Sequence, residues 1–200
     1  MDVEALDVPD AWVCRPTVHA DSRGDFLEWF RADLLRAATG RRFEVMQANH
    51  SRSRAGVLRG VHFADVDPGQ AKLVYCPQGA VLDVVVDVRV GSPTFGRHAA
   101  VLLDETERRA VFISEGLGHA FYALQDNSSV CYLMTSVYDP TAEHAVSPVD
   151  PALALPLPTE HPLVVSDRDA QAPTLAEAEA AGTLPTYEAC RARYAELSDG

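Results

Sequence analysis

Val81-Leu82-Asp83-Val84-Val85-Val86-Asp87-Val88-Arg89-Val90 is the stretch of this sequence that indicates its fold most clearly. Every even-numbered residue in it is apolar, whereas the odd-numbered residues mix valines with Asp83, Asp87 and Arg89. Because side chains alternate between the two faces of a β-strand, this pattern predicts a strand over residues 81–90 with one core face and one partly polar face.

Further strand candidates follow at intervals of roughly ten residues, with turn residues between them. They lie at residues 99–103, 110–113, 119–124 and 130–137. Short strands at such regular spacing are typical of a sandwich or barrel of antiparallel strands. The sequence therefore predicts an all-β fold.

Helices are expected only at the periphery. Residues 26–35 favour a strand that becomes a short helix, which Gly40 ends. After a proline-rich loop over residues 148–173, Thr174 and Glu177 have the spacing of a capping box that opens a short helix. A second helix is expected over residues 187–197, where apolar residues recur at three- and four-residue steps.

The size and charge of the chain limit its partners. Its 200 residues suit a single domain with a tail. The formal net charge of −12 argues against a nucleic acid or an anionic membrane as partner, because both require a basic face. A phosphate-containing ligand would have to be held by a few local arginines.

The cysteines and the apolar segments indicate the compartment. Cys14, Cys76, Cys131 and Cys190 are widely spaced and form no C-x-x-C pair, so we expect buried free thiols in a reducing environment. The first residues lack the features of a signal peptide, and no uninterrupted apolar run is long enough to cross a bilayer. We therefore expect a cytoplasmic protein.

A candidate site begins at Arg59-Gly60-Val61-His62-Phe63, which Lys72 follows ten residues after His62. Lys72 is the only lysine among seventeen basic residues, which favours a need for an amine over an ordinary exposed lysine. Arg59 and His62 are three residues apart and cannot both face inward on a regular strand. Either Gly60 hosts a bulge that re-aims one of them, or only His62 points into the barrel.

Other polar residues lie on strands that should be buried. Tyr132 and Tyr138 share one face of residues 130–138, either as functional phenols or as aromatic side chains that line a sheet. His119 alternates with Phe121 and Ala123, and a hydrogen-bonded core histidine is the commoner explanation there.

Several chemistries are not indicated. A metal-binding cupin would show two histidines at H-x-H spacing, but Phe63 and Ala64 follow His62, so we expect no metal. The sequence contains no G-x-G-x-x-G before a helix, no P-loop and no G-x-S-x-G motif.

An ordered set of short motifs resembles the dTDP-4-dehydrorhamnose 3,5-epimerase family over residues 12–185. The motifs are Asp21-Ser22-Arg23-Gly24, Gln47-Ala48-Asn49-His50-Ser51, Leu58-Arg59-Gly60-Val61-His62-Phe63, Gln70-Ala71-Lys72, 83–89, 92–96 and Ser166-Asp167-Arg168-Asp169. The resemblance implies a jelly-roll barrel of the cupin type over residues 1–185, with a helical tail over 186–200. It also implies a homodimer that acts on a dTDP-4-keto-6-deoxyhexose without a metal or an organic cofactor.

The same resemblance assigns roles to individual residues. It implies that His62 is a base, Tyr132 an acid, Asp169 the partner of the histidine, and Lys72 a donor to the sugar carbonyl oxygen. The implied nucleotide- and sugar-binding residues are Arg23, Glu28, Gln47, Asn49, Arg59, His119 and Glu143, with Tyr138 stacking on the thymine. Arg168 stands where the family has a lysine beside the aspartate.

Departures from the family pattern bear on the site of reaction. Ala48, Ala64 and Gly118-His119-Ala120 replace other residues near the sugar, and the sequence looks more like the antibiotic-sugar branch. That branch includes enzymes that act only at carbon 3 or only at carbon 5; the sequence leans towards carbon 3. The alternatives are a 3,4-ketoisomerase of the same substrate and a nucleotide-sugar-binding cupin without catalysis.

Overall fold

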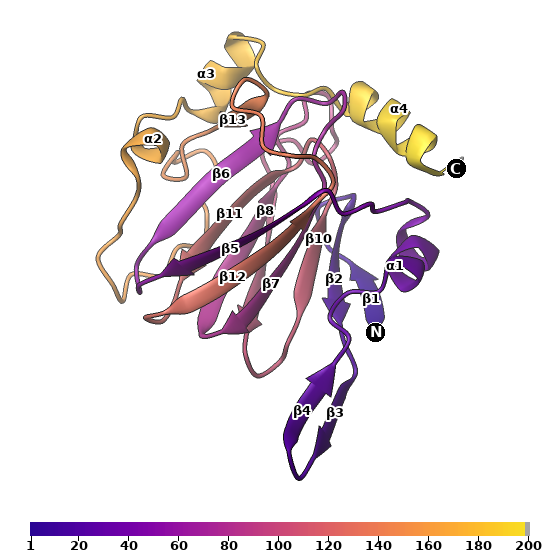
Figure 1. Cartoon of the computed structure of the whole chain (residues 1–200). Helices are drawn as coiled ribbons and strands as arrows, with labels where there is room; N and C mark the ends of the chain where they lie inside the picture. Colours follow the sequence, from indigo (N-terminus) through magenta and orange to yellow (C-terminus); the bar gives the residue numbers. More distant parts are fainter. Residues whose placement is uncertain (199–200) are drawn as a thin grey trace.

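Two antiparallel β-sheets face each other in the computed structural model, which describes residues 1–198 (Figure 1). The first sheet has the strand order β1-β2-β10-β7-β12-β5. Its strands are β1 (Asp2–Ala5), β2 (Ala11–Arg15), β10 (Ala110–Ile113), β7 (Lys72–Gln78), β12 (Ser128–Met134) and β5 (Gln47–Ser53). Strand β5 therefore forms one edge of this sheet.

The second sheet has the order β13-β6-β11-β8-β9. Its strands are β13 (Glu143–Ala145), β6 (Leu58–Ala64), β11 (Gly118–Ala123), β8 (Ala80–Val86) and β9 (His98–Asp104). A separate hairpin of β3 (Val18–Asp21) and β4 (Gly24–Leu27) projects from the body of the molecule (Figure 1). The predicted all-β jelly-roll fold of antiparallel strands is confirmed.

Within residues 1–198, four short helices lie at the periphery: α1 (Ala32–Thr39), α2 (Asp167–Ala170), α3 (Leu175–Ala180) and α4 (Tyr187–Ser198). The sequence predicted three of them, and the fourth, α2, lies in the segment 148–173 that was expected to be a loop. Helix α1 ends at Gly40 in a left-handed conformation, and Thr174 and Glu177 form the predicted capping box of α3. The last two residues of the predicted 186–200 tail lie outside the described residues.

The C-terminal segment covers the outer face of β8, so this strand is buried on both faces. Val81 and Val85 pack between the sheets, whereas Val84 and Val86 pack on the outer face against Leu175 and Ala178 of α3. Asp83 lies on the same partly polar face as Val81 and Val85, so it points between the sheets and is fully buried. The strand ends at Val86, before the predicted boundary at Val90.

The residues that follow β8 form a buried ionic cluster. Arg89 is completely buried and donates to both carboxylate oxygens of Asp87, to Asp10 and to the hydroxyl of Tyr194 on α4. Burial alone would raise the pKa of Asp87, but hydrogen bonds, chiefly from Arg89, outweigh it and hold that pKa below its ordinary value. The cluster joins the N-terminal segment, the β8–β9 turn and α4.

A β-bulge interrupts the pairing of β6 with β11. His119 pairs with His62 and Phe121 pairs with Arg59, so two residues of β6 lie opposite one residue of β11. Gly60 adopts a φ of 113°, and a Cβ atom there would lie 2.4 Å from the carbonyl oxygen of His119. This is the bulge that was one of the two alternatives for the Arg59–His62 spacing, and it needs a glycine.

Two further expectations concern cysteines and membranes. All four cysteines are free; three are buried as predicted, while Cys131 is half-buried. Within residues 1–198, no helix has the length and apolar character needed to span a membrane.

Replacing Arg89 with leucine is expected to lower the free energy of unfolding by about 3–5 kcal/mol, because Asp87 would stay buried with only neutral partners. Urea unfolding at pH 7 measures this loss. Arg15→Leu is the matched control, since its pair with Glu4 is exposed and contributes about 0–1 kcal/mol. The difference in free energy of unfolding between the unmodified protein and Arg89→Leu should narrow below about pH 4, where Asp87 of the variant protonates. Equal urea midpoints for the two variants would contradict this account.

Candidate active site

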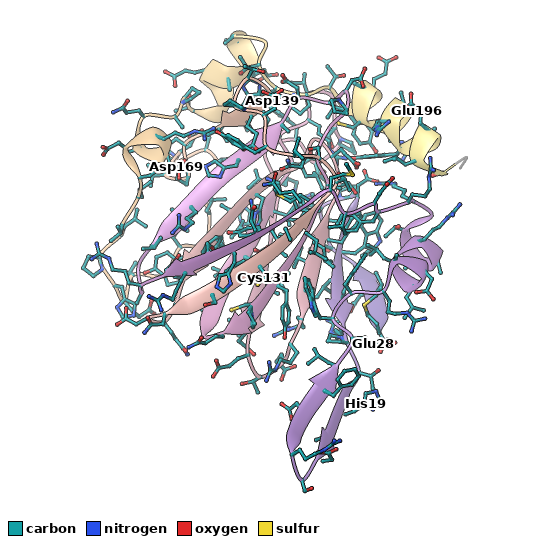
Figure 2. All side chains as sticks on the ribbon, in the orientation of Figure 1. His19, Glu28, Cys131, Asp139, Asp169 and Glu196 are labelled. Carbon is teal, nitrogen blue, oxygen red and sulfur yellow. The ribbon has the colours of Figure 1, made fainter. Side chains whose placement is uncertain are left out.

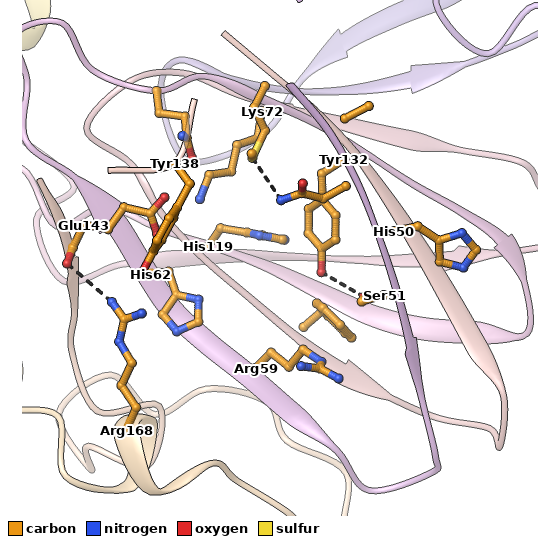
Figure 3. Close-up of a pocket in the computed structure, with 15 residues that line it drawn as sticks. His50, Ser51, Arg59, His62, Lys72, His119, Tyr132, Tyr138, Glu143 and Arg168 are labelled. Carbon is orange, nitrogen blue, oxygen red and sulfur yellow. Dashed lines mark hydrogen bonds between the residues drawn. The ribbon is translucent and has the colours of Figure 1, made fainter. Parts of the chain in front are cut away.

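A cavity of about 460 Å³ opens between the two sheets, at the end where polar side chains replace the apolar core. Most of the residues predicted to form a site line it (Figure 3). They are Asn49, Arg59, His62, Lys72, His119, Tyr132, Tyr138, Glu143 and Arg168. The alternative that only His62 of its strand points inward is wrong, because the bulge brings Arg59 to the same cavity.

The cavity has two chemically different walls. His62 on β6, His119 on β11 and Glu143 on β13 belong to the five-stranded sheet. Lys72 on β7 and Tyr132 on β12 belong to the six-stranded sheet. His62 and Tyr132 therefore extend into the cavity from opposite sides.

His62 is oriented by a carboxylate from outside the sheets. Its Nε2 lies 2.7 Å from Oδ1 of Asp169, which is buried in α2. The other carboxylate oxygen accepts a hydrogen bond of 3.3 Å from the backbone N–H of Gly60 in the bulge. Burial raises the pKa of Asp169, but its hydrogen bonds, first that from His62, bring the net pKa below the ordinary value. An ionised Asp169 accepts from Nε2, which leaves Nδ1 of His62 free to take a proton.

Lys72 lies at the start of β7, opposite Met134 of β12. Burial lowers the pKa of its ammonium group, and the nearby carboxylate of Glu143 opposes that shift. The only lysine of the chain is thus a half-buried amine that lines the cavity. Such an amine can donate to one oxygen of a bound ketone.

Tyr132 is packed into the wall opposite His62. Its ring lies edge-on to His119, with ring centroids 6.2 Å apart, and its hydroxyl lies 3.3 Å from Oγ of Ser51. Burial raises the pKa of this phenol well above its ordinary value, so Tyr132 holds its proton at neutral pH and can act as an acid.

His119 forms a second histidine–aspartate pair deeper in the barrel. Its Nε2 lies 2.7 Å from Oδ2 of Asp83, and both side chains are buried. It is therefore a hydrogen-bonded core histidine and a lining residue of the cavity at once. Its partner Asp83 belongs to the partly polar face that the strand pattern predicted for residues 81–90.

The rim of the cavity carries the remaining polar groups. Gln47 does not line the cavity; it donates to Asn49 and accepts from the backbone N–H of Tyr138, which links β5 to the segment after β12. Arg59 donates to Ser53, and Arg168 donates to the backbone carbonyl of Glu143. Arg59 and Arg168 are two cations at the opening of an acidic protein.

Arg23 and Glu28 do not reach this cavity. Arg23 lies in the turn of the projecting hairpin, where it is bonded to Asp21 and its side chain is 87% exposed. Glu28 follows β4 and pairs with Arg31; it lies far across the molecule from Asp169 (Figure 2). The expectation that both residues belong to the site is therefore not met within one chain.

Sequence reasoning missed some of the lining residues. Ser51, Phe121, Met134 and Gln70 line the cavity, although none of them was assigned a role. Ser51 lies in strand β5, which spans Gln47–Ser53. The alternation of Gln47, Asn49 and Ser51 was the signal that could have placed Ser51 on the inner face.

Comparisons with known proteins agree with this geometry. The family model described as dTDP-4-dehydrorhamnose 3,5-epimerase matches residues 5–177. A relative of that name from Mycolicibacterium smegmatis is 55% identical over 192 residues, which cover 96% of this chain and 94% of the relative.

Solved structures match over nearly the whole chain. The rmlC epimerase of Mycobacterium tuberculosis has a TM-score of 0.96 at 50% identity, covering 98% of this chain and 100% of that one. ChmJ, a 3′-monoepimerase from Streptomyces bikiniensis in complex with dTDP-quinovose, has a TM-score of 0.95 at 46% identity, covering 98% of both chains. The chain therefore belongs to the dTDP-4-dehydrorhamnose 3,5-epimerase family.

Proposed function

We propose that this protein is an epimerase that inverts carbon 3, carbon 5 or both of a dTDP-4-keto-6-deoxyhexose, with carbon 3 favoured. The observation that carries the proposal is the position of His62 and Tyr132 on opposite walls of one cavity, with Lys72 beside them. Inversion next to a ketone needs a base on one face of the sugar, an acid on the other, and a donor to the enolate oxygen.

Each group has one task in this reaction. Nδ1 of His62 removes the proton next to the ketone, and Asp169 holds the ring by Nε2 and favours the imidazolium that forms. Lys72 donates to the ketone oxygen as negative charge develops on it. Tyr132 then gives its phenolic proton to the opposite face of the same carbon, which inverts it.

The nucleotide is held at the rim. Arg59 and Arg168 are the cations placed to bind the diphosphate through charge-assisted hydrogen bonds. Tyr138 is half-exposed beside the cavity, where its ring is available to stack on the thymine. His119, Asn49 and Glu143 line the space left for the hexose.

The preference for carbon 3 is supported by the residues near the sugar and by the likeness to the 3′-monoepimerase ChmJ. Ala48 and Ala64 are the small side chains that depart from the family pattern there. Ala48 lines the cavity, and Ala64 pairs directly with Glu143 across β6 and β13, on the same face as that carboxylate.

Nuclear magnetic resonance of the reaction with dTDP-4-keto-6-deoxyglucose in deuterated water tests the proposal. The product should carry deuterium next to the ketone at the inverted carbon, and His62→Ala should lower the rate by about 10²- to 10⁴-fold. His98→Ala, on the outer strand β9, is the matched control and should keep full activity. An active His62→Ala variant would contradict the proposal. A product whose carbonyl has moved to carbon 3 would contradict it as well, and so would binding of the nucleotide sugar without proton exchange.

The substitution Asp169→Asn tests whether Asp169 orients His62 or contributes to substrate binding. The amide oxygen of the introduced side chain would accept from Gly60, which turns its NH₂ group towards Nε2 of His62 and leaves the proton on Nδ1. We expect kcat to fall by about 10²- to 10⁴-fold with KM little changed, because the wrong tautomer cannot act as base. Asp167→Asn, exposed in the same helix, should behave as the unmodified enzyme. A KM effect without a kcat effect would refute this role for Asp169.

We further propose that the protein is a homodimer in which Arg23 and Glu28 serve the site of the other copy. The β3–β4 hairpin pairs only with itself in the described chain and exposes 66% of Phe26, and an isolated hairpin is marginally stable in water. Strand β5, beside the cavity, has an unpaired edge, which is a surface that another strand can join.

Complementation between two defective variants tests this arrangement. Arg23→Ala should weaken substrate binding by about 10-fold or more through the lost charged contact. In a re-equilibrated 1:1 mixture of Arg23→Ala and His62→Ala, half the dimers are mixed and each has one complete site, so activity at low substrate should recover to about a quarter of normal. Activity no greater than the average of the two separate variants would contradict it.

A further inference from the structure

The hydroxyl group of Tyr132 has one hydrogen-bond partner among the described residues, Oγ of Ser51 at 3.3 Å (Figure 3). Tyr132 pairs with Asn49 and Val130 pairs with Ser51 across β12 and β5. Ser51 and Tyr132 are therefore diagonal neighbours on the inner face, and the strand register fixes their contact.

Apart from Arg59, whose positive charge favours the phenolate, the rest of the phenol's surroundings offer its oxygen little. The ring faces His119 and Phe121, with centroids 6.2 Å and 6.4 Å away. Nε2 of His119 is already bonded to Asp83. When Tyr132 gives up its proton, the phenolate left in this wall needs a donor, because an unpaired buried charge is costly.

We propose that Ser51 is a positioning residue for the acid: its hydroxyl holds the phenol of Tyr132 and donates to the phenolate that forms when the proton is transferred. This inference rests on the proposed epimerase function. The O–H bond of Tyr132 breaks as the new C–H bond forms at the sugar carbon, while His62 holds the proton removed earlier. Water then takes the proton from His62 and returns one to Tyr132, whose partner Ser51 is half-buried on the edge strand β5.

The proposal predicts a change in how the enolate intermediate partitions. It can be reprotonated by Tyr132, which inverts the carbon, or by His62, which restores the substrate. His62 also lines a second cavity of about 440 Å³, between β6 and residues 164–169. Water on that side exchanges the proton on His62, so reprotonation by His62 in deuterated water yields deuterated, uninverted substrate.

Ser51→Ala should therefore slow the step at Tyr132 without slowing the step at His62. In initial-rate experiments in deuterated water, we expect the ratio of deuterium in recovered substrate to inverted product to rise about 10-fold, as for loss of one hydrogen bond to a charged group. The rate of deprotonation, summed over both products, should stay within about 2-fold. Ser51→Thr keeps the hydroxyl and should restore the normal ratio.

Ser53→Ala is the matched comparison. It removes a hydroxyl from the same face of β5, two residues further along, where the partner is Arg59. It should raise KM through Arg59 and leave the partition ratio unchanged.

The proposal would be overturned if Ser51→Ala lowered deuterium exchange into the substrate and inversion to the same extent, or left the ratio of deuterated substrate to inverted product unchanged. It would also be overturned if Ser51→Thr did not restore the normal ratio. These outcomes differ from failure of the proposed function, in which the unmodified enzyme itself would show no inversion.

Discussion

The carboxylate of Asp169 makes two contacts on which the geometry of the cavity depends. One oxygen holds the ring of His62, and the other satisfies the backbone N–H of Gly60 in the bulge of β6. A bulge leaves backbone groups unpaired, and a buried unpaired N–H is costly, so the residue that orients the histidine also stabilises the local backbone that aims it. The C-terminal segment that carries Asp169 is thereby part of the barrel wall.

The division of the barrel into a dry half and a polar half follows from side-chain alternation on two facing sheets. In the dry half, Val85, Leu103 and Val111 fill the space between the sheets. Towards the open end, the same inner face carries His62 from one sheet and Tyr132 from the other. Two groups that must act on opposite faces of a flat enolate are separated because they are built on different sheets, which hold them rigidly apart.

The pattern of residues along the sequence predicted much of the fold and of the site, and the places where it failed have physical causes. Alternation and spacing predicted strands over residues 81–90, 99–103, 110–113, 119–124 and 130–137, and the three-residue spacing of Arg59 and His62 made a bulge at Gly60 one of two alternatives. Asp169 lies 107 residues from His62 in a proline-rich segment, so only the family resemblance pointed to it. Alternation distinguishes the two faces of the strand that carries Asp83 but does not say that both are buried: Asp83 lies between the sheets with Val81 and Val85, and a C-terminal layer covers the opposite face. Arg23 belongs to a family motif, but the sequence pattern does not place it relative to the cavity.

The arginine-only surface has a practical consequence for handling this enzyme. Since Lys72 is the only lysine and lies in the cavity with a lowered pKa, the side chains of the enzyme offer acylating reagents a single amine. Bound substrate would shield it. Amine chemistry carried out without substrate would therefore block the cavity, whereas the same chemistry in the presence of substrate would leave this amine unmodified.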